Sequence, residues 1–100
     1  MADRRKLNEE EIRERLRTLP GWSSMGGKLH REFQFRDFAE AFSFMTGGAL
    51  IAERMNHHPE WFNVYNRLVV DLSTHSVGGI SELDFTFAAE LNGLAGKSAR

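Results

Sequence analysis

The stretch that decides the fold is residues 53–61, which read ERMNHHPEW. A long helical pattern ends here, because proline lacks a backbone N–H and disfavours helical geometry in the residue before it, His58. We therefore expect a sharp bend that holds His57 and His58 at the end of a helix. Imidazole titrates closest to neutral pH, and a helix C-terminus favours its protonated form, so the bend is suited to proton transfer. The alternative is a surface turn with two solvated histidines.

The helix before this bend is predicted to start at Asp37, with Glu40 as its capping-box partner, and to continue to about Asn56. Two apolar strips at helical spacing are expected to be buried. So wide an apolar arc in a short chain suggests that another subunit covers part of it. Gly47-Gly48, in the middle, indicates either close approach of a neighbouring element or a kink. The first strip comprises Phe38, Ala41, Phe42, Met45, Ala49 and Ala52, and the second comprises Phe44, Leu50, Ile51 and Met55.

Two strands follow the bend, at residues 61–65 and 68–73, with a turn at Asn66-Arg67; a single long strand through Asn66 is the alternative. A loop then leads to a last helix, which Ser81 caps with Asp84 at the capping-box position. The apolar stripe of this helix is expected to be Leu83, Phe87, Leu91 and Leu94.

The chain before Asp37 starts with a helix that Asn8 caps, with Glu11 at the capping-box position, and that ends at Pro20-Gly21. A hairpin follows, with strands at residues 22–25 and 28–35. In its second strand His30 alternates with polar residues and is expected to be solvated, whereas Arg31 interrupts the apolar face.

The order of these elements is helix, hairpin, long helix, hairpin, helix. It predicts an α+β domain of two layers, a four-stranded antiparallel sheet with about three helices on one face. One hundred residues, 41% of them hydrophobic, fill one core, so we expect residues 1–100 to form a single domain.

Composition narrows the possible partners and location. Thirteen basic and 14 acidic residues give a net charge of −1 without a basic cluster, so we expect no direct binding of nucleic acid or anionic lipid. The chain has no cysteine, which excludes disulfides and thiol nucleophiles. Residues 1–17 lack an apolar signal region, and no apolar run approaches the roughly 20 residues of a membrane span. We therefore expect a cytoplasmic protein without a membrane partner.

Three histidines, His57, His58 and His75, stand at the ends of elements, where sites are often built. With Glu53 or Asp84 they could form a zinc set, but the i, i+4 histidine spacing is absent and adjacent side chains diverge, so we expect no metal. A metal-free site with one imidazole as acid and another as base suits elimination of water. Trp61 could flank a flat ring substrate, or could be a core or interface residue.

At these positions the sequence resembles the pterin-4a-carbinolamine dehydratase family. The resemblance includes the flanks, residues 21–22, 35–38, 41–46, 59–66 and 72–75, and so spans nearly the whole chain. The family pattern, in register throughout, falls on Glu53, His57, His58, Pro59, Tyr65, His75 and Asp84.

The resemblance implies dehydration of 4a-hydroxytetrahydropterin, the product of aromatic amino acid hydroxylases, to quinonoid dihydropterin, as in tetrahydrobiopterin recycling, without a cofactor. It implies that His57 and His75 are the acid–base pair, in either order, and that His58 orients the pterin. Glu53 is expected to help bind or orient the substrate. Asp84 is expected to do so too, or to serve only as a helix cap.

The resemblance has two further implications. Vertebrate members carry an acid at Asn56 and an arginine at Leu83, so this chain lacks both members of a charge pair or has a changed pocket rim. Some members also bind the dimerisation helix of a homeodomain transcription factor through an apolar helical face that otherwise forms the homo-oligomer. The apolar arc from Phe44 to Met55 is compatible with a homodimer or homotetramer. It does not indicate whether a helix of another protein binds there.

Overall fold

The computed structural model describes residues 4–96. Their order is helix, hairpin, long helix, hairpin, helix, and the strands form one antiparallel sheet, which confirms the predicted α+β class. Each strand begins and ends within one residue of its predicted bounds. The helices are α1 (Glu9–Leu16), α2 (Phe38–Met55) and α3 (Glu82–Ala95), the strands are β1 (Ser23–Met25), β2 (Lys28–Gln34), β3 (Glu60–Val64) and β4 (Arg67–Leu72), and η1 (His75–Val77) is one turn of 3-10 helix.

The strand order in the sheet is β1-β2-β4-β3, so β1 and β3 are the edges. A turn at Tyr65-Asn66 joins β3 to β4, one residue earlier than predicted, and rules out a single long strand. Tyr65 adopts a φ of 52° there, in the left-handed region that lets two antiparallel strands be joined by a tight turn.

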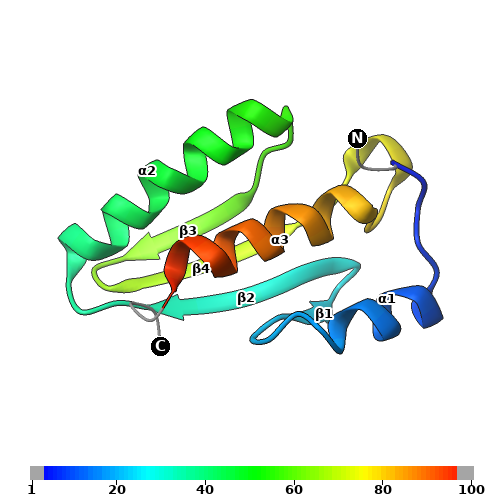
Figure 1. The fold of residues 1–100 in the computed structure, drawn as a ribbon, viewed down its shortest axis with the longest axis horizontal. Helices are drawn as coiled ribbons and strands as arrows, with labels where there is room; N and C mark the ends of the chain where they lie inside the picture. Colours follow the sequence, from blue (N-terminus) through cyan, green and yellow to red (C-terminus); the bar gives the residue numbers. More distant parts are fainter. Residues whose placement is uncertain (1–3, 97–100) are drawn as a thin grey trace.

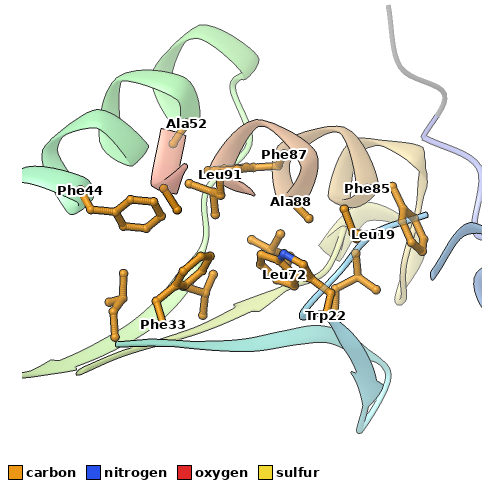
Figure 2. Close-up of a cluster of buried hydrophobic side chains, with 14 of the residues drawn as sticks. Leu19, Trp22, Phe33, Phe44, Ala52, Leu72, Phe85, Phe87, Ala88 and Leu91 are labelled. Carbon is orange, nitrogen blue, oxygen red and sulfur yellow. The ribbon is translucent and has the colours of Figure 1, made fainter. Parts of the chain in front are cut away.

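Helices α2 and α3 lie side by side over one face of the sheet, and α1 lies at its β1 end (Figure 1). Strand alternation sends Phe33 and Leu72 toward this face, where they meet Phe44 of α2 and Leu91 of α3 (Figure 2). The other face of the sheet carries charged and polar side chains together with a few exposed apolar ones.

The helix caps follow the sequence closely. Two of the three predicted capping boxes are present, Asn8 with Glu11 in α1 and Ser81 with Asp84 in α3. The Arg5 guanidinium and the Asn8 N–H lower the pKa of the Glu11 carboxyl to about 2. However, α1 ends at Leu16, before Pro20-Gly21.

The N-terminus of α2 differs from a capping box in one contact. The Asp37 side chain accepts from the backbone N–H of Glu40 at 2.9 Å, as predicted. The Glu40 carboxylate, however, accepts from the N–H of Arg36 at 2.8 Å and not from that of Asp37. The reciprocal half of the predicted box is therefore wrong by one residue.

The buried face of α2 is narrower than the predicted apolar arc. It runs through Ala41, Phe44, Gly48 and Ala52. Small residues occupy this line because α2 packs closely on α3 and the sheet. Of the buried residues, Ala41, Phe44 and Ala52 belong to the predicted strips, so helical periodicity located the buried face but made it too wide. Four residues predicted to be buried are exposed on α2, Phe38, Phe42, Ala49 and Leu50, as is Leu94 on α3.

The two glycines of α2 permit close approach, and the helix runs through them without a break. A Cβ atom on Gly48 would lie 3.0 Å from Cζ3 of Trp61, and one on Gly47 would lie 2.6 Å from Cδ2 of Leu94. Close approach of neighbouring elements, one of the two predicted explanations, therefore accounts for the pair.

Two residues of β2 have long-range partners that explain their positions. Arg31 lies on the apolar face with its guanidinium carbon 4.1 Å from the Phe33 ring centre, and it donates to Asn92 of α3 at 2.6 Å. His30 is not freely solvated as predicted, because its Nδ1 lies 2.8 Å from Asp71 Oδ1 and its side chain is only 23% exposed.

Candidate active site

The corner after α2 is set by a left-handed residue. Asn56 has φ 51° and ψ 47°, a conformation that asparagine tolerates better than most residues, and its N–H donates to the last carbonyls of the helix. The N–H of His57 then donates to the carbonyl of Ala52 at 3.0 Å. The chain therefore reverses one residue before the histidine pair. His57 is consequently directed inward and is 7% exposed, whereas the side chain of His58 is 59% exposed.

His57 is fixed by a buried carboxylate. Its Nε2 lies 2.5 Å from Oδ1 of Asp84, which is fully buried near the start of α3. Oδ2 of Asp84 accepts from Thr74 Oγ1 at 2.8 Å and from the Ser81 N–H at 2.9 Å. Both carboxylate oxygens are therefore occupied by protein donors. Asp84 thus contacts His57 directly and acts on a pocket ligand only through that ring.

A carboxylate accepts hydrogen bonds and does not donate them, so Nε2 of His57 carries the proton in this contact. The other ring nitrogen, Nδ1, is then the atom of His57 that is left for a ligand. In a serine–histidine–aspartate triad a buried aspartate likewise fixes the tautomer and the orientation of the imidazole.

His58 has a carboxylate partner of its own. Its Nε2 lies 2.9 Å from Oε2 of Glu53, on the last turn of α2, and both side chains are mostly exposed. Glu53, which was predicted to bind or orient the substrate, therefore contacts His58. An exposed pair of this kind contributes little to the free energy of folding.

His75 reaches the site from the opposite side. It is the first residue of η1 and follows Thr74, whose N–H donates to the carbonyl of Gly79 at 2.7 Å and closes the loop. Its side chain is 85% exposed, and Nε2 lies 3.6 Å from Oε2 of Glu60. Glu60 was not predicted as a site residue, because nothing in its sequence neighbourhood indicates that the loop after β4 reaches the first residue of β3.

The three histidines line one open pocket of about 240 Å³. The three side chains predicted as substrate contacts do not line it: Glu53 contacts His58, Asp84 is buried behind His57, and Trp61 is half-buried against Gly48 of α2 and the core. The remainder of the lining is mostly polar and comprises Arg4, Asn56, Ser73, Thr74 and Ser76.

Residues 4–96 contain neither a metal-binding group nor a membrane-spanning helix. No group of three or more histidine, cysteine, aspartate or glutamate side chains is arranged to hold a metal ion. In the same range no helix is long and apolar enough to cross a membrane.

Comparison with known proteins identifies the family. The family profile described as pterin 4 alpha carbinolamine dehydratase matches residues 5–94. The chain belongs to this family. All three pocket histidines and their carboxylate partners lie within the matched residues.

Relatives of the pterin 4 alpha carbinolamine dehydratase family cover most of the chain. A protein of Solibacter usitatus with the provisional name pterin-4-alpha-carbinolamine dehydratase is 60% identical over 90 residues, 90% of this chain and 95% of that protein. The crystal structure of a transcriptional coactivator/pterin dehydratase from Brucella melitensis has a TM-score of 0.88 and 49% identity, and covers 91% of this chain and 99% of that one.

The family fold also occurs in a protein with another role. A pterin dehydratase-like protein identified as a RuBisCO assembly factor in the alpha-carboxysome has a TM-score of 0.66 at 25% identity, covering 76% of this chain and 90% of that one. Membership of the family therefore does not by itself decide the activity, which depends on the residues of the pocket.

Proposed function

We propose that this protein dehydrates 4a-hydroxytetrahydropterin to quinonoid dihydropterin and water, in the recycling of tetrahydrobiopterin. The observation that carries the proposal is the pairing of His57 with a buried carboxylate on one side of a pocket that His75 lines from the other side. Membership of the dehydratase family and the names of the relatives support the same reaction.

The reaction needs two proton transfers. A base removes the proton on N5 while an acid protonates the hydroxyl on C4a; water leaves and a C4a=N5 double bond forms. Histidine performs both tasks near neutral pH. His57 is the base in this proposal, because Asp84 occupies Nε2 and leaves Nδ1 as an acceptor. His75 is then the acid, and His58 orients the pterin ring with Glu53 behind it.

The test is the decay of 4a-hydroxypterin absorbance with wild type, with His75→Ala and with the double variant His57→Ala plus His75→Ala. General acid–base groups typically contribute about 10²- to 10⁴-fold, so His75→Ala is expected to lose roughly that much of the turnover rate. Since His75 is exposed, this variant should unfold at the wild-type temperature. Wild type that does not accelerate the decay over buffer would sink the proposal.

A binding role is a second candidate, favoured by the exposed Phe38, Phe42 and Leu50 on α2 and by the coactivator named in the Brucella structure. A pure binding module would keep its partner affinity in the double histidine variant, whereas the dehydratase would lose activity. The two functions are compatible, because the pocket and the exposed face of α2 are different surfaces.

The remaining expectations belong to the same proposal. The substrate is a reduced pterin, the reaction uses no cofactor, and the protein acts in the cytoplasm as a homo-oligomer without direct contact with nucleic acid or membrane. Mass determination in solution and enzyme assay after dialysis against a chelator test the oligomer and the absence of a metal requirement.

A further inference from the structure

Each of the three pocket histidines has a carboxylate partner, and the partner of His75 lies on the uncovered face of the sheet. Glu60 is the first residue of β3, and its two oxygens face different groups. Oε1 accepts from Lys28 Nζ at 2.6 Å, and Oε2 lies 3.6 Å from Nε2 of His75. Glu60 therefore connects the uncovered face of the sheet to one wall of the pocket.

The contact from Lys28 spans three strands. Lys28 starts β2, Glu60 starts β3, and β4 lies between them with Asp71 directly opposite Glu60. Glu60 raises the pKa of the Lys28 ammonium, chiefly through their hydrogen bond, and Asp71 adds to this effect. The lysine side chain thus crosses β4 to hold a carboxylate on the far strand.

The charge of Glu60 follows from the same contact. The hydrogen bond from Lys28 lowers the pKa of the Glu60 carboxyl, and His75 lowers it further. Glu60 is consequently ionised at neutral pH and presents an acceptor to the imidazole. Because Lys28 holds the Glu60 carboxylate in place, this carboxylate can keep the His75 imidazole in one orientation better than a free surface carboxylate could.

The orientation of His75 depends on such a carboxylate more than the orientation of His57 does. Asp84 and the surrounding core hold His57, whereas the side chain of His75 is 85% exposed on a short 3-10 turn. We propose that Glu60, held by Lys28, is a positioning residue for His75 and fixes the imidazole toward the pocket. The catalytic consequence rests on the proposed function; the orientation itself does not.

The first measurement is structural and independent of activity. Three-bond NMR couplings across χ1 of His75 are compared in wild type, Glu60→Gln and Glu32→Gln. Glu32 is the matched control, because it is also 48% exposed on the uncovered sheet face and pairs with Arg67 at 2.7 Å. We expect one dominant rotamer in wild type and Glu32→Gln and averaged couplings in Glu60→Gln. Unchanged couplings in Glu60→Gln would overturn the proposal.

The second measurement is kinetic. Glu60→Gln is expected to lower kcat about tenfold or more with KM within about twofold, because loss of orientation affects the proton transfer more than binding. Lys28→Met is expected to lower kcat in the same direction by less, and Lys28→Arg to retain it. Adding Glu60→Gln to His75→Ala should cause no further loss, since residues that act through one group are non-additive.

The outcomes separate the two proposals. Losses that multiply in the double variant, or a loss in Glu32→Gln equal to that in Glu60→Gln, would contradict a positioning role for Glu60. If wild type has no dehydratase activity, the proposed function fails, and the χ1 couplings alone decide whether Glu60 orients His75.

Discussion

Asparagine at position 84 would offer one acceptor oxygen where the carboxylate offers two. The Ser81 N–H and the Thr74 hydroxyl both bond to Oδ2 of Asp84, so the amide oxygen of an Asp84→Asn variant is expected to stay with them. Its NH₂ group would then face His57 and require an acceptor at Nε2. The proton would move to Nδ1, and His57 would present a donor to the pocket instead of an acceptor.

We therefore expect Asp84→Asn to lower kcat by about 10²- to 10⁴-fold, as wrong-tautomer variants of histidine–aspartate pairs do. The free energy of unfolding should fall by only about 1–3 kcal/mol, because most of the hydrogen bonds are kept. Assays of 4a-hydroxypterin decay and urea unfolding measure the two effects.

Asp37→Asn is the control for this variant. Asp37 caps α2 at a helix N-terminus, as Asp84 does in part for α3, but it has no histidine partner. Asp37→Asn should leave kcat within about twofold, since asparagine is an equally good N-cap. Equal losses in the two variants would mean that Asp84 serves the helix and not His57.

At the residue scale, the candidate site was partly visible in the sequence. The capping box of Asp84 depends on neighbours along the chain and was predicted, whereas its contact with His57 joins residues 27 positions apart. The partners of Glu60 and His30 were not predicted either, because they lie on other strands. Local sequence spacing predicts helix caps and bends. Contacts across the sheet depend on the pairing register of the strands, which the strand pattern alone did not determine.

At the element scale, the two glycines of α2 give a matched pair. A Cβ on Gly48 would meet the Trp61 ring at 3.0 Å and Leu91 at 3.3 Å, and Leu91 is fully buried. The three atoms nearest to a Cβ on Gly47 all belong to the side chain of Leu94, which is 45% exposed and can rotate away. The helix therefore tolerates a methyl group at one position better than at the next.

Gly47→Ala is expected to stabilise the protein by up to about 1 kcal/mol, the helix-propensity difference between glycine and alanine. Gly48→Ala should lose that gain and destabilise by about 1 kcal/mol or more, because a crowded core must shift. Urea unfolding measures both variants. Equal stabilisation by the two substitutions would show that Trp61 does not pack closely on α2.

The elements differ in how far the sequence could define them. Hairpins and helix starts were predicted to within a residue because turn and capping residues act locally. The buried face of α2 was predicted in part: Ala41, Phe44 and Ala52 were expected to be buried and are, whereas Gly48 carries no hydrophobic signal and was missed. Close packing on Trp61 and Leu91 requires a small residue at Gly48, whereas helical spacing also placed Phe38 and Phe42 in the core, although both are exposed.

At the scale of the whole molecule, two apolar surfaces have no partner among residues 4–96. One is on α2 and includes Phe38, Phe42 and Leu50, which are 49%, 55% and 70% exposed. The other is on the uncovered side of the edge strand β3 and includes Phe62 and Val64. Exposed apolar patches mark association surfaces, and an edge strand is a ready template for pairing.

Because these surfaces lie on different sides of the sheet, each can bind another copy of the chain independently. We expect a homotetramer, with a mass in solution four times the 11.4 kDa of the chain. Phe42→Lys and Phe62→Lys should each reduce it to a dimer, since a charge at an interface position of phenylalanine typically costs about 2 kcal/mol or more. Light scattering after size-exclusion chromatography measures the mass.

Met25→Lys is the control, because Met25 is 56% exposed but lies on β1, at the opposite edge of the sheet. It should leave the tetramer intact. A monomeric wild type at micromolar concentration would contradict the prediction. If only Phe42→Lys reduced the mass, association would depend on α2 alone, and the exposed Phe62 would need another partner. The histidine pocket should retain its activity in both variants, since neither Phe42 nor Phe62 lines it.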